Sequence, residues 1–122
     1  MSLTIKIVLW LVLSIFIVSR AHTEPVLEEG NGVICDTQAQ IVEFASRNAT
    51  PEAIQQINVG KTVCALVNVR YYRGEEVART TANNKSLQVV KILVVEVNVH
   101  GVWGSIKPEV QYTLFAIEEV PV

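Results

Sequence analysis

Apolar and polar residues alternate along much of the chain after residue 63, and this period of two limits the fold more than any other feature. It is clearest in residues 65–72 and 95–100, and it is typical of half-exposed strands. Turn-forming residues interrupt it at Gly74, at residues 82–86 and at His100-Gly101. Such short connections favour antiparallel pairing, because a parallel crossover needs a dozen or more residues.

The longest predicted strand, residues 87–99, carries an irregularity near its centre. Its polar positions change parity between Lys91 and Glu96, which a bulge or bend explains. Residues 75–81 resume the strand that Gly74 breaks, whereas Pro108 separates the last two strands, at residues 102–106 and 111–118. We therefore predict a strongly bent antiparallel sheet of four to five strands.

Two helices are predicted ahead of this sheet. Asp36 is a suitable N-cap for a helix over residues 37–47, in which Ile41, Phe44 and Ala45 form one apolar face. Thr50 caps the second helix, Pro51 occupies its first position, and Gly60 ends it. Both helices lie between Cys35 and Cys64, and we interpret them as one helical hairpin.

These elements predict a single α+β domain over residues 33–122, with an N-terminal helical hairpin packed on the bent sheet. A chain of 122 residues leaves no room for a second core. Two forms of the sheet are compatible with the pattern. It closes into a small SH3-like barrel with the helices over one face or end, or it stays open with the helices across it.

Residues 1–21 are typical of a secretory signal peptide. Lys6 supplies the positive start, residues 7–18 are apolar except for Ser14, and Ser19-Arg20-Ala21 offers small residues at the cleavage positions. An uncleaved anchor is the alternative, but the run is shorter than the roughly 20 residues of a membrane helix. We expect a periplasmic or secreted protein beginning at His22, with residues 22–32 as a flexible lead-in.

Export to an oxidising compartment favours a structural role for the two cysteines. In an oxidising compartment Cys35 and Cys64 most simply form one disulfide that closes the helical segment. A redox or nucleophilic thiol is the alternative. The sequence has no C-x-x-C motif, and His100 is the single histidine inside the predicted domain.

Charge and motifs narrow the range of functions. Without Lys6 and Arg20, the 10 basic and 12 acidic residues of the chain become 8 and 12, a net charge of −4. A nucleic-acid binder needs a basic surface, so we expect no nucleic-acid partner, and we expect no stable membrane insertion after signal cleavage. No glycine-rich phosphate motif or nucleophile elbow occurs, and two cysteines cannot build a four-cysteine zinc site. We predict no cofactor, no metal site and no catalytic residue.

The segment Arg70 to Glu76 and Trp103 supply the candidate interaction surface, formed by Arg70, Tyr72, Arg73 and Trp103. Tyrosine, tryptophan and arginine are frequent hot spots of protein contacts. The structural alternative is a strand end with a charged turn, with the tyrosines and Trp103 partly in the core.

Three segments resemble small exported bacterial proteins of uncharacterised function: the run CDTQAQIVEF at residues 35–44, RGEEVA at residues 73–78 and the strand VVKILV at residues 89–94. The resemblance covers nearly all of the mature region. It implies a periplasmic setting and assigns no catalytic residue.

The first hypothesis for function is an exported binding or interaction domain without catalysis, with another protein as a partner. One alternative is a small secreted hydrolase whose residues gather around Glu75, Glu96 and His100. A second is an inhibitor of a secreted enzyme, which would need a protruding loop around Asn83-Asn84. The hydrolase hypothesis predicts that at least two of the side chains of Glu75, Glu96 and His100 converge in a cleft.

Overall fold

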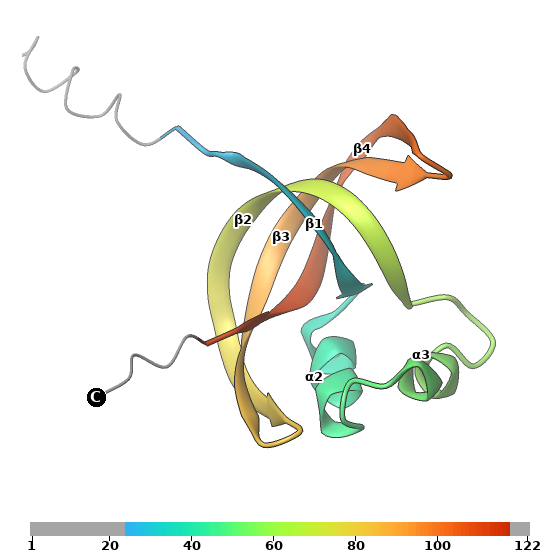
Figure 1. Cartoon of the computed structure of the whole chain (residues 1–122), viewed down its shortest axis with the longest axis vertical. Helices are drawn as coiled ribbons and strands as arrows, with labels where there is room; N and C mark the ends of the chain where they lie inside the picture. Colours follow the sequence, from blue (N-terminus) through green and yellow to red (C-terminus); the bar gives the residue numbers. More distant parts are fainter. Residues whose placement is uncertain (1–23, 118–122) are drawn as a thin grey trace, which may run out of the picture.

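Four antiparallel strands and two short helices make up the part of the chain that the structure, a computed structural model, describes: residues 24–117 (Figure 1). The strands pair in the order β1-β2-β3-β4 and close into a barrel. The α+β class and the closed antiparallel sheet are therefore confirmed, whereas a likeness to SH3-like barrels stays a prediction. The elements are β1 (Leu27–Cys35), α2 (Gln38–Ser46), α3 (Pro51–Ile57), β2 (Cys64–Ala82), β3 (Lys85–Val99) and β4 (Val102–Ala116).

Strand β1 corrects the predicted start of the domain. Residues 27–32, expected to be a flexible lead-in, pair with β2 from Leu27↔Tyr72 to Cys35↔Cys64. The helices consequently lie between β1 and β2 instead of forming a hairpin ahead of the sheet. The predicted signal peptide and His22 lie outside the described residues.

Bulges, not strand breaks, bend the sheet. The predicted strands at residues 65–72 and 75–81 are one strand, β2, whose pairing with β3 shifts between Arg73 and Glu76. Gly74 lies inside this bulge, where a Cβ atom would stand 2.6 Å from the carbonyl oxygen of Lys91. The chain therefore bends closely over β3 at a position that only glycine fits.

The irregularity predicted between Lys91 and Glu96 is confirmed. The β3–β4 register moves from Val94↔Glu109 to Glu96↔Ser105, so an excess of β4 residues faces Val95. Pro108 falls within this excess and therefore does not end the strand, contrary to expectation. A proline without a ladder hydrogen bond is tolerated at a bulge.

The helix ends follow the sequence signals with two changes. Thr37, not Asp36, is the N-cap of α2, because its hydroxyl accepts from the Gln40 N–H while the Gln40 side chain accepts from the Thr37 N–H. Thr50 and Pro51 begin α3 as predicted. This helix ends at Ile57, before the expected Gly60.

The predicted disulfide Cys35–Cys64 joins the end of β1 to the start of β2, with the two Cα atoms 4.1 Å apart. Asn58 supports the same corner. Its side-chain oxygen accepts from the backbone N–H groups of Val63 and Cys64, and its amide donates to the Cys64 carbonyl oxygen at 2.7 Å. The segment that carries both helices is thus fastened at its two ends to neighbouring strands.

The core has two parts. The first lies under α2 and α3, where Ile41 and Phe44 pack with the disulfide and with Val89. The second lies inside the barrel and is formed by the inward side chains of β2 and β3, namely Val69, Tyr71, Val90, Ile92 and Val94. Packing of apolar side chains on both sides of β3 explains why its centre is apolar at successive positions.

Candidate functional site

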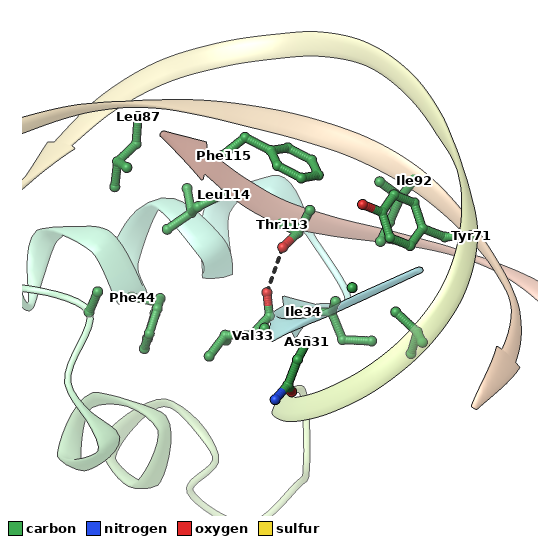
Figure 2. Close-up of a pocket in the computed structure, with 14 residues that line it drawn as sticks. Asn31, Val33, Ile34, Phe44, Tyr71, Leu87, Ile92, Thr113, Leu114 and Phe115 are labelled. Carbon is green, nitrogen blue, oxygen red and sulfur yellow. Dashed lines mark hydrogen bonds between the residues drawn. The ribbon is translucent and has the colours of Figure 1, made fainter. Parts of the chain in front are cut away.

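The barrel wall opens where β1 meets β4. Strand β1 pairs with β2 along its whole length, but it pairs with β4 only at Ile34↔Thr113 and Cys35↔Tyr112. Beyond these pairs the strands diverge, and the Thr113 hydroxyl donates a hydrogen bond of 2.8 Å to the Val33 carbonyl oxygen at the point of separation (Figure 2). The residues of β1 before Val33 have no partner on β4.

A cavity of about 390 Å³ occupies this opening. Figure 2 shows its lining, which comes from β1, from α2 and the loop after it, and from the three other strands. The apolar side chains greatly outnumber the polar ones, and the main contributors are Val33, Ile34, Phe44, Val69, Tyr71, Leu87, Ile92, Leu114 and Phe115. Cavities of this size and character are typical small-molecule sites.

Two glycines of β1 leave room for the cavity. Gly30 and Gly32 stand opposite Val69 and Val67, so they occupy inward-facing positions of the barrel wall. A Cβ atom on Gly32 would meet no atom within 4 Å, whereas one on Gly30 would lie 3.4 Å from the Tyr71 ring. Larger side chains at these positions would fill the space that now lies empty.

An arginine marks the edge of the cavity. The guanidinium carbon of Arg73 lies 3.8 Å from the ring centroid of Phe115, which lines the cavity. Its Nε and Nη2 atoms donate to the two carboxylate oxygens of Glu28 at 3.0 and 2.9 Å. Arg73 on β2 therefore connects β1 with β4 across the opening.

The pKa of Arg73 is raised above its ordinary value. The hydrogen bond with Glu28 is the largest cause, and the charge of Glu28 and the side chain of Tyr71 act in the same direction, while partial burial opposes them. The guanidinium is therefore positively charged at every pH at which a protein of this kind is studied. A permanently charged guanidinium, paired with one carboxylate, therefore lies against Phe115 at the edge of the cavity.

The predicted interaction surface is divided by the sheet. Arg70, Tyr72 and Trp103 belong to the outer face, where Arg70 forms a 2.9 Å ion pair with Glu96 and lies 4.0 Å over the Trp103 ring. Arg73 instead packs on Phe115 at the edge of the opening. The four residues thus form two separate groups.

An exposed apolar row crosses the same outer face. The strand registers place Leu27, Tyr72, Leu93 and Val110 side by side, one on each strand. The exposed fractions of Leu27, Leu93 and Val110 are 46%, 36% and 44%. The next row holds Glu29, Arg70 and Glu96, so charged residues border the apolar row.

The residues of the hydrolase hypothesis do not gather. Glu75 lies in the bulge of β2, between the pairs Arg73↔Ile92 and Glu76↔Val90. Glu96 is further along β3 and is held by Arg70, and His100 stands exposed in the β3–β4 turn with a positive φ of 52°. At about 3.3 Å per strand residue, the bulge is more than 10 Å from Glu96 along the ladder.

The loop of the inhibitor hypothesis is a tight turn tied to the rest of the protein. Asn83 and Asn84 both have positive φ, at 51° and 63°, as a two-residue hairpin requires. The Asn83 amide donates to the carbonyl oxygen of Asn48 in the loop between α2 and α3. This contact fastens the turn to the helical segment.

A second, smaller cavity of about 170 Å³ is lined by residues of all four strands together with Asp36 and Val63. Asp36, Glu109 and Gln111 contribute polar atoms, and the Gln111 amide donates to Asp36 at 3.0 Å. Across residues 24–117, no three His, Cys, Asp or Glu side chains gather in a way that would hold a metal ion.

Sequence reasoning missed residues that line the larger cavity, above all Gly30, Gly32 and Thr113, and it missed Glu28, which binds Arg73 beside the cavity. The sequence held one indication of a strand here, because Gly30 and Gly32 alternate with polar residues directly before the apolar pair Val33-Ile34. Glycine is rare in strand interiors, however, and the acidic, glycine-containing stretch is more typical of a loop.

Comparison with known protein families, curated proteins and solved structures finds no match to this chain. Neither α2 nor α3 has the length and apolar character of a membrane-spanning helix.

Proposed function

We propose that this chain is an exported, non-catalytic binding domain that takes up a small, mostly apolar molecule in the cavity between β1 and β4. The observation that carries the proposal is the cavity of about 390 Å³ with its apolar lining. Ligand sites in proteins are usually preformed, concave and apolar with a few polar groups, and their volumes start at about 300 Å³.

The shape of the opening supports the same function. Close packing normally leaves few voids larger than a water molecule in a protein interior. Here two glycines stand at inward-facing positions, and Gly32 has free space beyond it. An apolar ligand that covers these walls is stabilised in the complex by about 25 cal/mol per Å² of apolar surface removed from water.

The expected export of the chain agrees with a binding function outside the cytoplasm. The signal-like residues 1–21 and the Cys35–Cys64 disulfide both fit a periplasmic or secreted protein. A small binding domain in that compartment would carry or sense a molecule that crosses the cell boundary.

The test is binding of the neutral fluorescent probe N-phenyl-1-naphthylamine to the purified mature chain. We expect a saturable rise in fluorescence, and Gly32→Leu, which fills the cavity, should weaken binding about tenfold or more. Gly104→Leu is the matched control, because Gly104 also has free space around its Cβ position but does not line the cavity.

Circular dichroism must show both variants folded, and Gly32→Val replaces Gly32→Leu if the larger side chain prevents folding. No saturable binding to the wild-type chain would overturn the proposal. Equal affinity for the wild-type chain and a folded Gly32 variant would overturn the assignment of the cavity.

The outer face favours a second candidate function, contact with a second copy of this chain. The apolar row Leu27, Tyr72, Leu93 and Val110 spans all four strands. The adjacent row carries Arg70 between two glutamates, so a two-fold-related copy can place opposite charges together. Sedimentation velocity should show a dimer that Leu93→Lys abolishes, whereas a monomer at every concentration would exclude it.

A further inference from the structure

The ion pair at the mouth of the cavity points to the chemistry of the ligand. We propose that the cavity selects a neutral amphipathic molecule, with an apolar body and one uncharged hydrogen-bond acceptor such as a hydroxyl or carbonyl oxygen, over a carboxylate of the same length. The inference rests on the proposed binding function, because it concerns the ligand of the same cavity.

Arg73 is placed to receive the polar end of a ligand. It packs over Phe115, and Tyr71, two residues earlier on β2, also lines the cavity. The Arg73 side chain keeps 43% of its surface exposed, so it stands between the apolar lining and water. A ligand with its apolar body in the cavity would bring its polar end to this edge.

Arg73 retains hydrogen-bonding capacity after it binds Glu28. A guanidinium has five N–H donors, and the Glu28 carboxylate accepts from Nε and Nη2. A hydroxyl or carbonyl oxygen can therefore accept from the remaining donors without displacing Glu28. A hydrogen bond from a charged donor is stronger than one between neutral groups.

Glu28 disfavours an acidic ligand at the same place. Its carboxylate neutralises the charge of Arg73, so a ligand carboxylate at this edge would approach a neutral ion pair and lie close to a like charge. The exposed position screens this repulsion, so we expect an effect of about tenfold in affinity, not a complete exclusion. Removing the charge of Glu28 should remove the discrimination.

The experiment compares 1-decanol with decanoate as competitors of N-phenyl-1-naphthylamine at neutral pH. Decanoate is more hydrophilic than decanol for reasons unrelated to the protein, so the measured quantity is the decanol-to-decanoate affinity ratio in each variant. Glu28→Gln retains an amide oxygen that can accept from Arg73. We expect it to lower the decanol-to-decanoate affinity ratio about tenfold.

Glu29→Gln is the matched control. It changes the net charge equally one residue away, but Glu29 pairs in register with Arg70 on the outer face of the sheet. We expect it to leave the ratio within about twofold of the wild-type value.

The outcomes separate this inference from the binding proposal. If the probe binds and both competitors displace it, but Glu28→Gln leaves the ratio unchanged, the inference about ligand charge is wrong and the cavity assignment stands. An equal shift in Glu29→Gln would also overturn it, because the effect would then come from net charge. If the probe itself fails to bind, the proposed function fails first.

Discussion

Thr113, which belongs to the last residue pair of β1 and β4, donates a hydrogen bond of 2.8 Å to the carbonyl oxygen of Val33, the first β1 residue without a partner in this pairing. A side chain thus takes the place of the backbone ladder at the point where the two strands separate. Thr113 is 9% exposed, and its bond marks the boundary between the closed part of the barrel and the open cavity. The size of the cavity depends on this boundary.

Loss of the Thr113 hydroxyl should loosen that boundary. Thr113→Val keeps the volume but removes the donor to Val33, so we expect the free energy of unfolding to fall by about 1 kcal/mol, as measured by urea denaturation. Thr81→Val, at an exposed position of β2, is the control and should change stability by less than about 0.5 kcal/mol. Equal stability of the two variants would show that the bond contributes nothing measurable.

The disulfide should carry a large share of the stability. Cys35→Ser with Cys64→Ser frees the two ends of the helical segment, and we expect a loss of roughly 2–4 kcal/mol because the unfolded chain regains conformational freedom. For a domain of this size that corresponds to a melting temperature about 10–25 °C lower by calorimetry. An unchanged melting temperature would show that the helices dock without the bond, and two titratable thiols in the native protein would contradict the disulfide itself.

Asn58 should be more important than its place after a short helix suggests. Its side chain makes hydrogen bonds to the backbone of Val63 and Cys64. Asn58→Ala leaves these partly buried backbone groups without their partner, and we expect a loss of about 2–3 kcal/mol in chemical denaturation. Gln55→Ala removes an exposed amide from the preceding helix and serves as the control. A loss for Asn58→Ala no greater than the control's would refute this role.

The N-terminus of the exported protein is a prediction from sequence alone. Cleavage after Ala21 should give a mature chain beginning at His22, because the residues before it match a signal-peptidase site. Intact-mass spectrometry of protein from its native host measures this directly. A full-length chain with Met1 in the membrane fraction would support the anchor instead.

Local and periodic features were accessible from the sequence by itself. The cap Thr50 with Pro51, the turns at Asn83-Asn84 and His100-Gly101, and the irregularity before Glu96 all appear where they were predicted. Each depends on the conformational preference of a few neighbouring residues or on an apolar period of two. The Cys35–Cys64 pairing was equally accessible, because there were only two cysteines to join.

Tertiary structure decided what surrounds the candidate site. Residues 27–32 become a strand because β2 offers a partner for their backbone, not because Gly30 and Gly32 favour strands. Arg73 reaches Glu28 and Phe115 instead of joining Arg70, since residues three apart on a strand point to opposite faces of the sheet and β1 and β4 bring Glu28 and Phe115 to the inner face. The cavity exists only because β1 and β4 part after two residue pairs. These contacts join residues far apart in the chain, so pairing across the whole sheet determines them and no local pattern encodes them.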